Sequence, residues 1–151
     1  MSLYIFASRL VCALLCGILI GLERQLRQRS AGLTTNSLVA VGACVFILVS
    51  ECVIANAVAA GGPVNNDNLR VLAQIVTGIG FLGAGVILRD GFTIHGLNSA
   101  ATLWCSAGVG SMCGYGLWRE AFIAVSVILF INWVLKLIEH IIEKHQKDEE
   151  A

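Results

Sequence analysis

The sequence contains few charged residues and a single proline. Charged side chains make up 13% of the 151 residues, whereas apolar side chains make up 57%. About a quarter of the residues are charged in an ordinary soluble domain, so this composition argues against a soluble fold. The apolar residues fall in runs of about 18, enough to cross a hydrocarbon core of about 30 Å. We therefore predict an all-α integral membrane protein.

Neither sign of charge is in excess, and the cysteines lack a metal-binding spacing. Ten lysine and arginine residues balance ten aspartate and glutamate residues, so we expect no nucleic-acid partner. The six cysteines include no C-x-x-C pair. Most lie inside apolar runs, where a thiol behaves as a small hydrophobic group, so we expect no metal site and no cofactor. A disulfide between Cys52 and Cys113 stays open, since both are expected near the same membrane face.

The apolar runs predict a bundle of about five transmembrane helices. The expected ranges are 3–22, 33–50, 71–88, 97–114 and 121–138. The end of the second range stays open, because Glu51 is followed by another mostly apolar stretch. The Gly, Pro and Asn residues of 61–68 predict a linker, and Asp90-Gly91 predicts a tight turn.

We divide the chain into a transmembrane domain, 1–138, and a charged cytoplasmic tail, 139–151. The first apolar run has no basic residues before it and no obvious cleavage site after it. We therefore expect a retained helix rather than a signal peptide.

Basic residues are distributed unequally between the two sides of the predicted bundle. If the first loop is cytoplasmic, the inner side holds Arg24, Arg27, Arg29, Arg89, Lys136, Lys144 and Lys147, and the outer side holds Arg70 and Arg119. Short cytoplasmic loops are enriched in lysine and arginine. The N-terminus is therefore predicted outside and the C-terminus inside.

The fourth predicted span carries a stripe of polar and small residues. Its members recur every four positions: Asn98, Thr102, Ser106, Gly110 and Gly114. Polar groups in hydrocarbon need partners, so this stripe should face the bundle interior, with Cys105 on an adjoining face. Contact between helices, a docking surface for a partner and a polar pocket all remain open as its role.

Further polar candidates gather near the predicted cytoplasmic ends of the helices. They are Glu23, Arg24, Asn36, Arg89, Asp90 and Asn98. Thr35 and Asn36 in the second span and Gln74 in the third are also buried-polar candidates. The group at the helix ends is predicted to form one cluster. It either anchors the short loops or constitutes a functional site.

Small residues in two other spans predict close contact between helices. Ala13, Gly17 and Gly21 are spaced by four residues in the first span. The third span contains the string G-x-G-x-x-G, but inside an apolar run rather than between a strand and a helix. We interpret it as a packing motif, with Gly80 and Ala84 on the contact face.

The acidic residues argue against a magnesium pore formed by this chain alone. Magnesium prefers oxygen ligands, typically carboxylates. The predicted span ends and loops contain Glu23, Glu51, Asp67, Asp90 and Glu120, and the middle of each predicted span contains none. The three histidines lie in a loop and in the tail, where they form no catalytic set with a serine or cysteine. We predict that the chain is not an enzyme.

Three sequence blocks resemble a known family. Residues 21–25 (GLERQ) with 29–36 (RSAGLTTN) are similar to its G-x-E-R-Q…A-G-L-R-T signature, and 73–85 (AQIVTGIGFLGAG) is similar to its glycine-rich block. Residues 96–105 (GLNSAATLWC) are similar to its G-L-N-T-A-A-T-L-W block. The order and spacing over about residues 10–135 identify the chain as resembling the MgtC/SapB family.

The resemblance implies a bacterial inner-membrane protein with a periplasmic N-terminus and a cytoplasmic C-terminus. Members are linked to adaptation to low magnesium, to virulence and to survival inside macrophages. It implies a regulatory role through contacts with other membrane proteins, including the proton-translocating ATP synthase; the alternative is a transporter or permease for magnesium or another cation. Besides the lipid bilayer and such proteins, we expect further copies of this chain as partners. Asn98 and Cys105 are the implied functional residues, followed by Glu23, Arg24 and Asp90.

The chain departs from the family pattern at two points. Thr34 stands where the signature has a basic residue. Longer members also carry a cytoplasmic ACT-like domain after the fifth helix, whereas this chain ends shortly after its last predicted span. We therefore expect it to resemble the short, SapB-like members.

Overall fold

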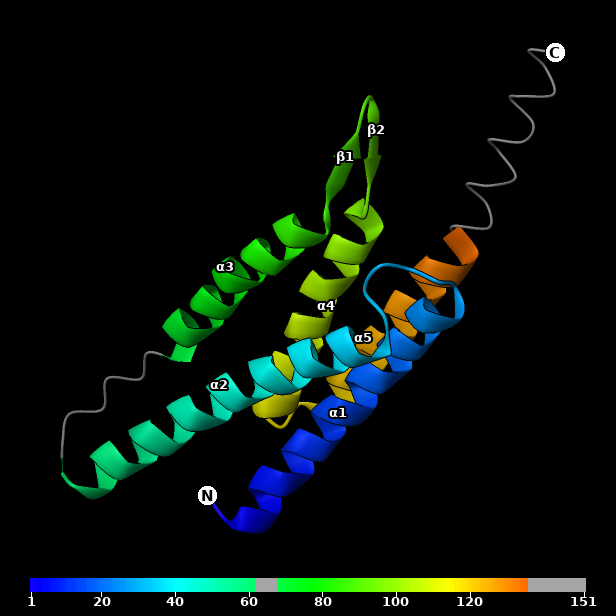
Figure 1. Cartoon of the computed structure of the whole chain (residues 1–151). Coiled ribbons are helices and arrows are strands. Elements are labelled where there is room, and N and C mark those ends of the chain that lie inside the picture. The colour runs from blue at the N-terminus through cyan, green and yellow to red at the C-terminus, as the bar shows by residue number, and fades with distance from the viewer. Residues whose placement is uncertain (62–67, 136–151) are drawn as a thin grey trace, which may run out of the picture.

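The computed structural model describes residues 1–61 and 68–135. Its elements are α1 (Leu3–Leu26), α2 (Leu33–Ala59), α3 (Asn68–Val86), β1 (Leu88–Asp90), β2 (Thr93–His95), α4 (Leu97–Gly114), α5 (Trp118–Phe130) and a π-helical turn, η1 (Ile131–Leu135) (Figure 1). The predicted tail, 139–151, and the end of the predicted fifth span lie outside the described residues.

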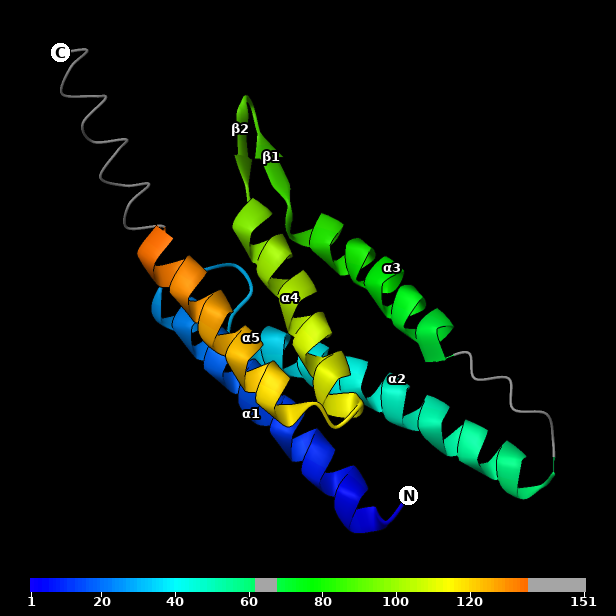
Figure 2. The same ribbon diagram turned by 180° about the vertical axis from the view of Figure 1, so that it is seen from behind.

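Helix α4 is the centre of the described bundle. It lies between α3 and α5 when the molecule is viewed from the front and from behind (Figures 1 and 2), and it contacts all four other helices. Helices α1 and α5 lie side by side, and α2 crosses both α1 and α4. The prediction of an all-α bundle of five helices is confirmed.

Within the described residues, three helices have the length and apolarity of membrane spans. These are α1, α2 and the stretch Leu69–Val86 of α3. Many of their large apolar side chains, such as Leu14 and Phe46, are exposed, as expected for surfaces that contact lipid rather than water. Helix α4 is as long as the predicted fourth span, but its serines, glycines and Asn98 make it less apolar.

Helices α1 and α2 are both longer than predicted. Helix α1 continues to Leu26, four residues past the predicted end, and Glu23 pairs with Arg27 one turn later at 2.9 Å. Helix α2 continues through Glu51 to Ala59. The Glu51 carboxylate accepts a 2.6 Å hydrogen bond from Arg9, which also donates to the Gly114 carbonyl oxygen at 2.7 Å. Since Arg9 neutralises this carboxylate, α2 does not need to end there.

Small residues let α1 approach α2 closely, as the sequence predicted. A Cβ atom added at Gly17 would lie 2.6 Å from the Cα atom of Ser37, and one added at Gly21 would lie 2.6 Å from the Cα atom of Leu33. Real Cβ atoms do not make such contacts. The two backbones therefore meet at a separation that only glycine permits, as is typical of membrane helix pairs.

Helix α3 presents a different face to α4 from the one predicted. Its buried residues are Ile79 and Gly83, and a Cβ atom at Gly83 would lie 3.6 Å from the Cβ of Ala100. Gly80 and Ala84, the predicted contact face, are exposed. That prediction was wrong because a spacing of four residues shows that two residues share a helix face but not which face packs against the bundle.

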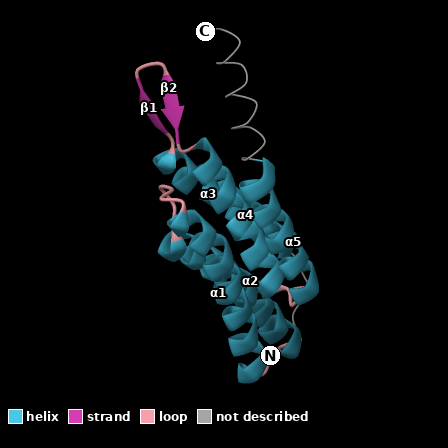
Figure 3. Ribbon diagram, turned by 90° about the vertical axis from the view of Figure 1, so that its right-hand side faces the viewer, coloured by secondary structure: helices cyan, strands magenta, loops and turns pink. Residues whose placement is uncertain are grey.

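The predicted tight turn is part of a two-stranded hairpin. Strands β1 and β2 pair antiparallel, with Arg89 opposite Ile94. Gly91 has a φ of +59°, which glycine adopts without strain in a two-residue hairpin turn. The hairpin projects beyond the ends of α3 and α4 (Figure 3).

Helix α5 begins three residues before its predicted start, at Trp118. Its last turn changes to π geometry at Ile131–Leu135, where Asn132 is buried. Single π turns in helices often occur at functional sites. This turn brings Asn132 next to the end of α1, as described below.

Candidate functional site

A buried arginine joins the end of α1 to the start of α4. Arg24 is 1% exposed. Its Nη1 donates to Asn98 Oδ1 at 2.6 Å, and its Nη2 donates to Ser99 Oγ at 2.6 Å. Both acceptors are neutral, so they engage the two terminal nitrogens of the guanidinium but do not cancel its charge. A buried charge held in this way is costly and depends strongly on each of its hydrogen bonds.

The network continues from α4 to the loop between α1 and α2 and to the start of α2. Ser30 donates to Ser99 Oγ at 3.0 Å. Asn36 is fully buried, and its Nδ2 donates to the carbonyl oxygens of Ala31 and Gly32 at 3.1 and 2.9 Å. Its Oδ1 accepts a 2.8 Å bond from Ser106. We refer to Arg24, Ser30, Asn36, Asn98, Ser99 and Ser106 as the polar layer.

The predicted stripe on α4 faces the bundle interior. Thr102, Ser106, Gly110 and Gly114 are buried. The Thr102 hydroxyl donates to the backbone oxygen of Asn98 at 2.8 Å, so it has a hydrogen-bond partner within its own helix. Asn98 is exposed as a residue but holds Arg24 through its amide oxygen. The stripe is thus a contact surface with α1 and α2, and this is where its polar groups find partners.

A second polar group lies beside the polar layer, between α1 and η1. Glu23 Oε1 lies 2.9 Å from Arg27 Nε, and Arg27 Nη1 donates to the backbone oxygen of Asn132 at 3.3 Å. Glu23 Oε2, Asn132 Nδ2 and Arg24 Nε are buried and have no hydrogen-bond partner in the structure as described. This group therefore has unused hydrogen-bonding capacity, whereas the polar layer is nearly satisfied.

Five predicted candidates lie outside this site: Thr35, Gln74, Arg89, Asp90 and Cys105. Asp90 is exposed on the hairpin, because β1 carries it past the helix ends. Gln74 was predicted to be buried but is exposed, because α3 contacts the bundle through another face. Cys105 is half-buried and lines an apolar cleft between α3, α4 and α5 with Trp104 and Gly108. The predicted single cluster is therefore smaller than expected.

The structure adds participants that the sequence pattern did not reveal. Ser99 was overlooked because it lies outside the four-residue stripe, although it is the residue directly after Asn98. Ser30 and Asn132 belong to a turn and to an irregular helix end, where periodicity carries no signal. The neighbouring basic stretch did indicate that the end of α1 would hold charge.

A cleft of about 630 Å³ separates α2 from α3. Its lining is mostly apolar, with small residues at Gly42 and Gly78 and polar side chains at Thr35 and Gln74. Added Cβ atoms at Gly42 and Gly78 would meet nothing within 4 Å in the described part of the chain. The cleft is thus an open surface with a backbone that another chain can approach closely.

The comparisons with known proteins agree with this architecture. The model of the MgtC family matches residues 10–141. The chain belongs to the MgtC family. It is 50% identical over 136 residues to Protein MgtC of Salmonella typhimurium strain LT2, covering 90% of this chain and 54% of that protein. It is 49% identical over 137 residues to Protein MgtC of Brucella abortus strain 2308, covering 91% and 54%.

The chain therefore spans about half the length of these MgtC relatives. The family match and the apolar helices agree on a membrane protein. No solved structure matches the chain.

Proposed function

We propose that this MgtC-family chain is a regulatory protein of the bacterial inner membrane and acts through helix contacts with other membrane proteins. The observation that carries the proposal is the open glycine surface of α3 beside the cleft. Only 11% of the apolar window of α3 is buried within the chain. A membrane helix with exposed glycines can accept a partner helix at short distance.

The cleft also offers a basis for selectivity. Thr35 and Gln74 place a hydroxyl and an amide on its walls, and both are exposed. A partner helix with a polar side chain at the matching depth would form a hydrogen bond that lipid cannot offer. We propose that the occupant is one transmembrane helix of a partner protein, with the membrane sector of the proton-translocating ATP synthase as the first candidate to test.

The proposed biological setting is adaptation to low magnesium and survival within macrophages, without catalysis by the chain itself. The described carboxylates support regulation over ion conduction. Glu23 and Glu51 pair with arginines, and Asp90 and Glu120 are exposed at an element end or in a first helical turn. A cation path would need free oxygen ligands deeper in the bundle.

The test is affinity purification of the tagged chain from native bacterial membranes, with Gly78→Leu and Gly80→Leu as a matched pair. Both glycines are exposed on α3, and an added Cβ atom at either meets nothing within 4 Å. Only Gly78 lines the cleft. Gly78→Leu should therefore abolish co-purification of a specific membrane protein, and Gly80→Leu should preserve it.

Equal recovery of the partner with both variants would exclude the cleft as the binding surface. Absence of any membrane protein with the unmodified chain would refute the regulatory proposal. Reconstitution into liposomes with magnesium- and potassium-sensitive dyes examines the alternative, and a flux that Gln74→Ala abolishes would favour a permease.

A further inference from the structure

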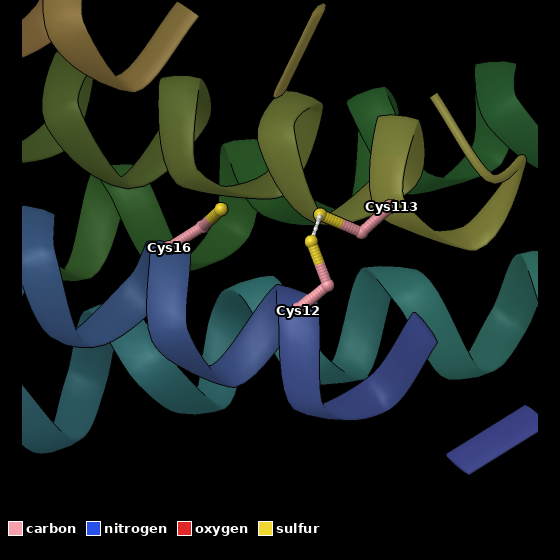
Figure 4. Close-up of side chains that lie close together, drawn as sticks. All are labelled: Cys12, Cys16 and Cys113. Carbon is pink, nitrogen blue, oxygen red and sulfur yellow. Dashed lines mark hydrogen bonds between the residues drawn. The ribbon is translucent and has the colours of Figure 1, made fainter. Parts of the chain in front are cut away.

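Three buried cysteines meet where α1 contacts α4, nearer the other end of these helices from the polar layer. Cys12 and Cys16 lie one turn apart on α1, and Cys113 belongs to the last turn of α4. They are 6%, 0% and 0% exposed. Figure 4 shows all three side chains in the space between the two helices. Among the described residues, this is the only group of three or more such ligand side chains close enough to share a metal ion.

The fold explains why cysteines a hundred positions apart come together. Residues four apart on a helix share one face, so Cys12 and Cys16 point the same way. Gly110 and Gly114 hold α4 close to α2, since a Cβ atom at Gly110 would overlap the backbone oxygen of Ala40. This close contact places the end of α4 over the same face of α1. Sequence spacing alone gave no sign of the group, because its third member comes from another helix.

The distances between the sulfur atoms fit a metal ion. All three lie within 4.8 Å of one another, and the sulfurs of Cys12 and Cys113 are 3.6 Å apart. A metal–thiolate bond is about 2.3 Å long, so three sulfurs around one ion in a plane stand about 4.0 Å apart. The observed sulfurs need to move by less than about an ångström to reach that geometry.

The surroundings select the kind of ion. The core around the sulfurs consists of apolar side chains such as Ile20, Leu48 and Val109, together with Cys44. Within the described residues, no histidine or carboxylate joins the three sulfurs. Zinc in structural sites is almost always four-coordinate. A soft ion that thiolates favour and that accepts three sulfur ligands fits better.

We propose that Cys12, Cys16 and Cys113 bind one Cu(I) ion and thereby fasten α1 to α4. The ion enters and stays as Cu(I), so no electron is transferred. Each thiol that becomes a thiolate releases one proton. One thiolate and two thiols leave the site neutral, whereas three thiolates would leave two negative charges in an apolar core at high cost. The site therefore releases one proton for each ion bound.

Two other states of these cysteines predict different results. Three thiols that serve only as small apolar groups would not retain copper. A disulfide between Cys12 and Cys113 would need their sulfurs to close from 3.6 Å to about 2.05 Å. All six cysteines are free in the structure, including Cys52, for which a bond to Cys113 had been left open.

The experiment is anaerobic titration of the purified full chain in detergent with Cu(I), against a chromophoric Cu(I) chelator. The unmodified chain should retain about one ion, and the ion should raise its thermal stability because it binds only the folded state. Cys113→Ala and Cys12→Ala should weaken binding by at least about 10-fold, as loss of a ligand costs no less than loss of its supporting contacts. Cys52→Ala and Cys105→Ala, outside the group, should bind as the unmodified chain does.

Two results would overturn the proposal. One is retention of Cu(I) that does not change in Cys113→Ala; the other is no retention by the unmodified chain with six alkylatable thiols. If Cys113→Ala or Cys12→Ala does not fold, X-ray absorption of the unmodified copper-loaded chain decides. Three sulfur neighbours at about 2.3 Å support the site, and a shell of nitrogen or oxygen neighbours excludes it.

Discussion

At the scale of single residues, the central feature is an arginine buried against neutral partners. Arg24 is held by Asn98 and Ser99, while the adjacent Glu23 pairs with Arg27. Guanidinium groups suit such positions because their planar array of donors can engage several acceptors at once. The stability of the chain is therefore sensitive to the loss of either acceptor, because a buried charge left without a hydrogen bond costs more free energy than the bond contributed.

Asn98→Ala should destabilise the chain by about 1–3 kcal/mol, because Arg24 Nη1 then loses its acceptor. Asn98→Asp is the matched control, since it keeps an oxygen at this position and places a negative charge opposite the guanidinium. Thermal unfolding in mild detergent measures both. Equal losses in the two variants would mean that the bond to Arg24 contributes little.

The sequence predicted which polar side chains of α4 face inward, but not their partners on other helices. The four-residue stripe correctly predicted that Thr102 and Ser106 face inward, because any polar group on a membrane helix needs a partner. It did not reveal that Asn36 would be the partner of Ser106, since that contact depends on how α2 crosses α4. Gln74 was misplaced for a related reason: its expected burial rested on its polarity alone, whereas its exposure depends on which face of α3 packs against α4.

At the scale of elements, the contact between α2 and α4 depends on glycine. Gly110→Ala should separate the two helices and cost about 1–3 kcal/mol, because the added methyl group overlaps the backbone of Ala40. Gly108→Ala on the same helix meets nothing within 4 Å in the described structure. It should be neutral or stabilising by up to about 1 kcal/mol, since alanine is the better helix former.

The same unfolding assay compares these two variants. A loss at position 108 as large as that at 110 would show that the close contact with Ala40 does not set the effect, because helix propensity alone predicts no loss for Gly→Ala.

Element boundaries were predicted well where turn residues or caps mark them. Leu97–Gly114 was predicted at both ends, with Gly96 before it at a φ of +87°. The end of α2 was left open because Glu51 looked like a terminus by charge alone. Its partner Arg9 comes from another helix, so no local rule could show that the charge would be neutralised.

At the scale of the whole molecule, the hairpin and the start of α5 lie at opposite ends of helix α4 (Figure 1). The distribution of basic residues predicts the hairpin on the cytoplasmic side. Asp90→Cys should therefore react with a membrane-impermeant thiol reagent only after cells are permeabilised. Arg119→Cys should react in intact cells, with the unmodified chain as background. The reverse pattern would invert the proposed orientation.

The three helices α1, α2 and α4 are tied together at two levels. Arg24 joins α1 to α4 near one end, and Arg9 joins α1 to both α2 and Gly114 near the other. The main neighbour of helix α3 is α4, and only 11% of the apolar window of α3 is buried within the chain. Helix α3 is thus held less tightly than α1, α2 and α4. We expect the amide hydrogens of α3 to exchange with solvent before those of α1, α2 and α4. A partner helix bound in the cleft should slow this exchange, because it would hold α3 in place.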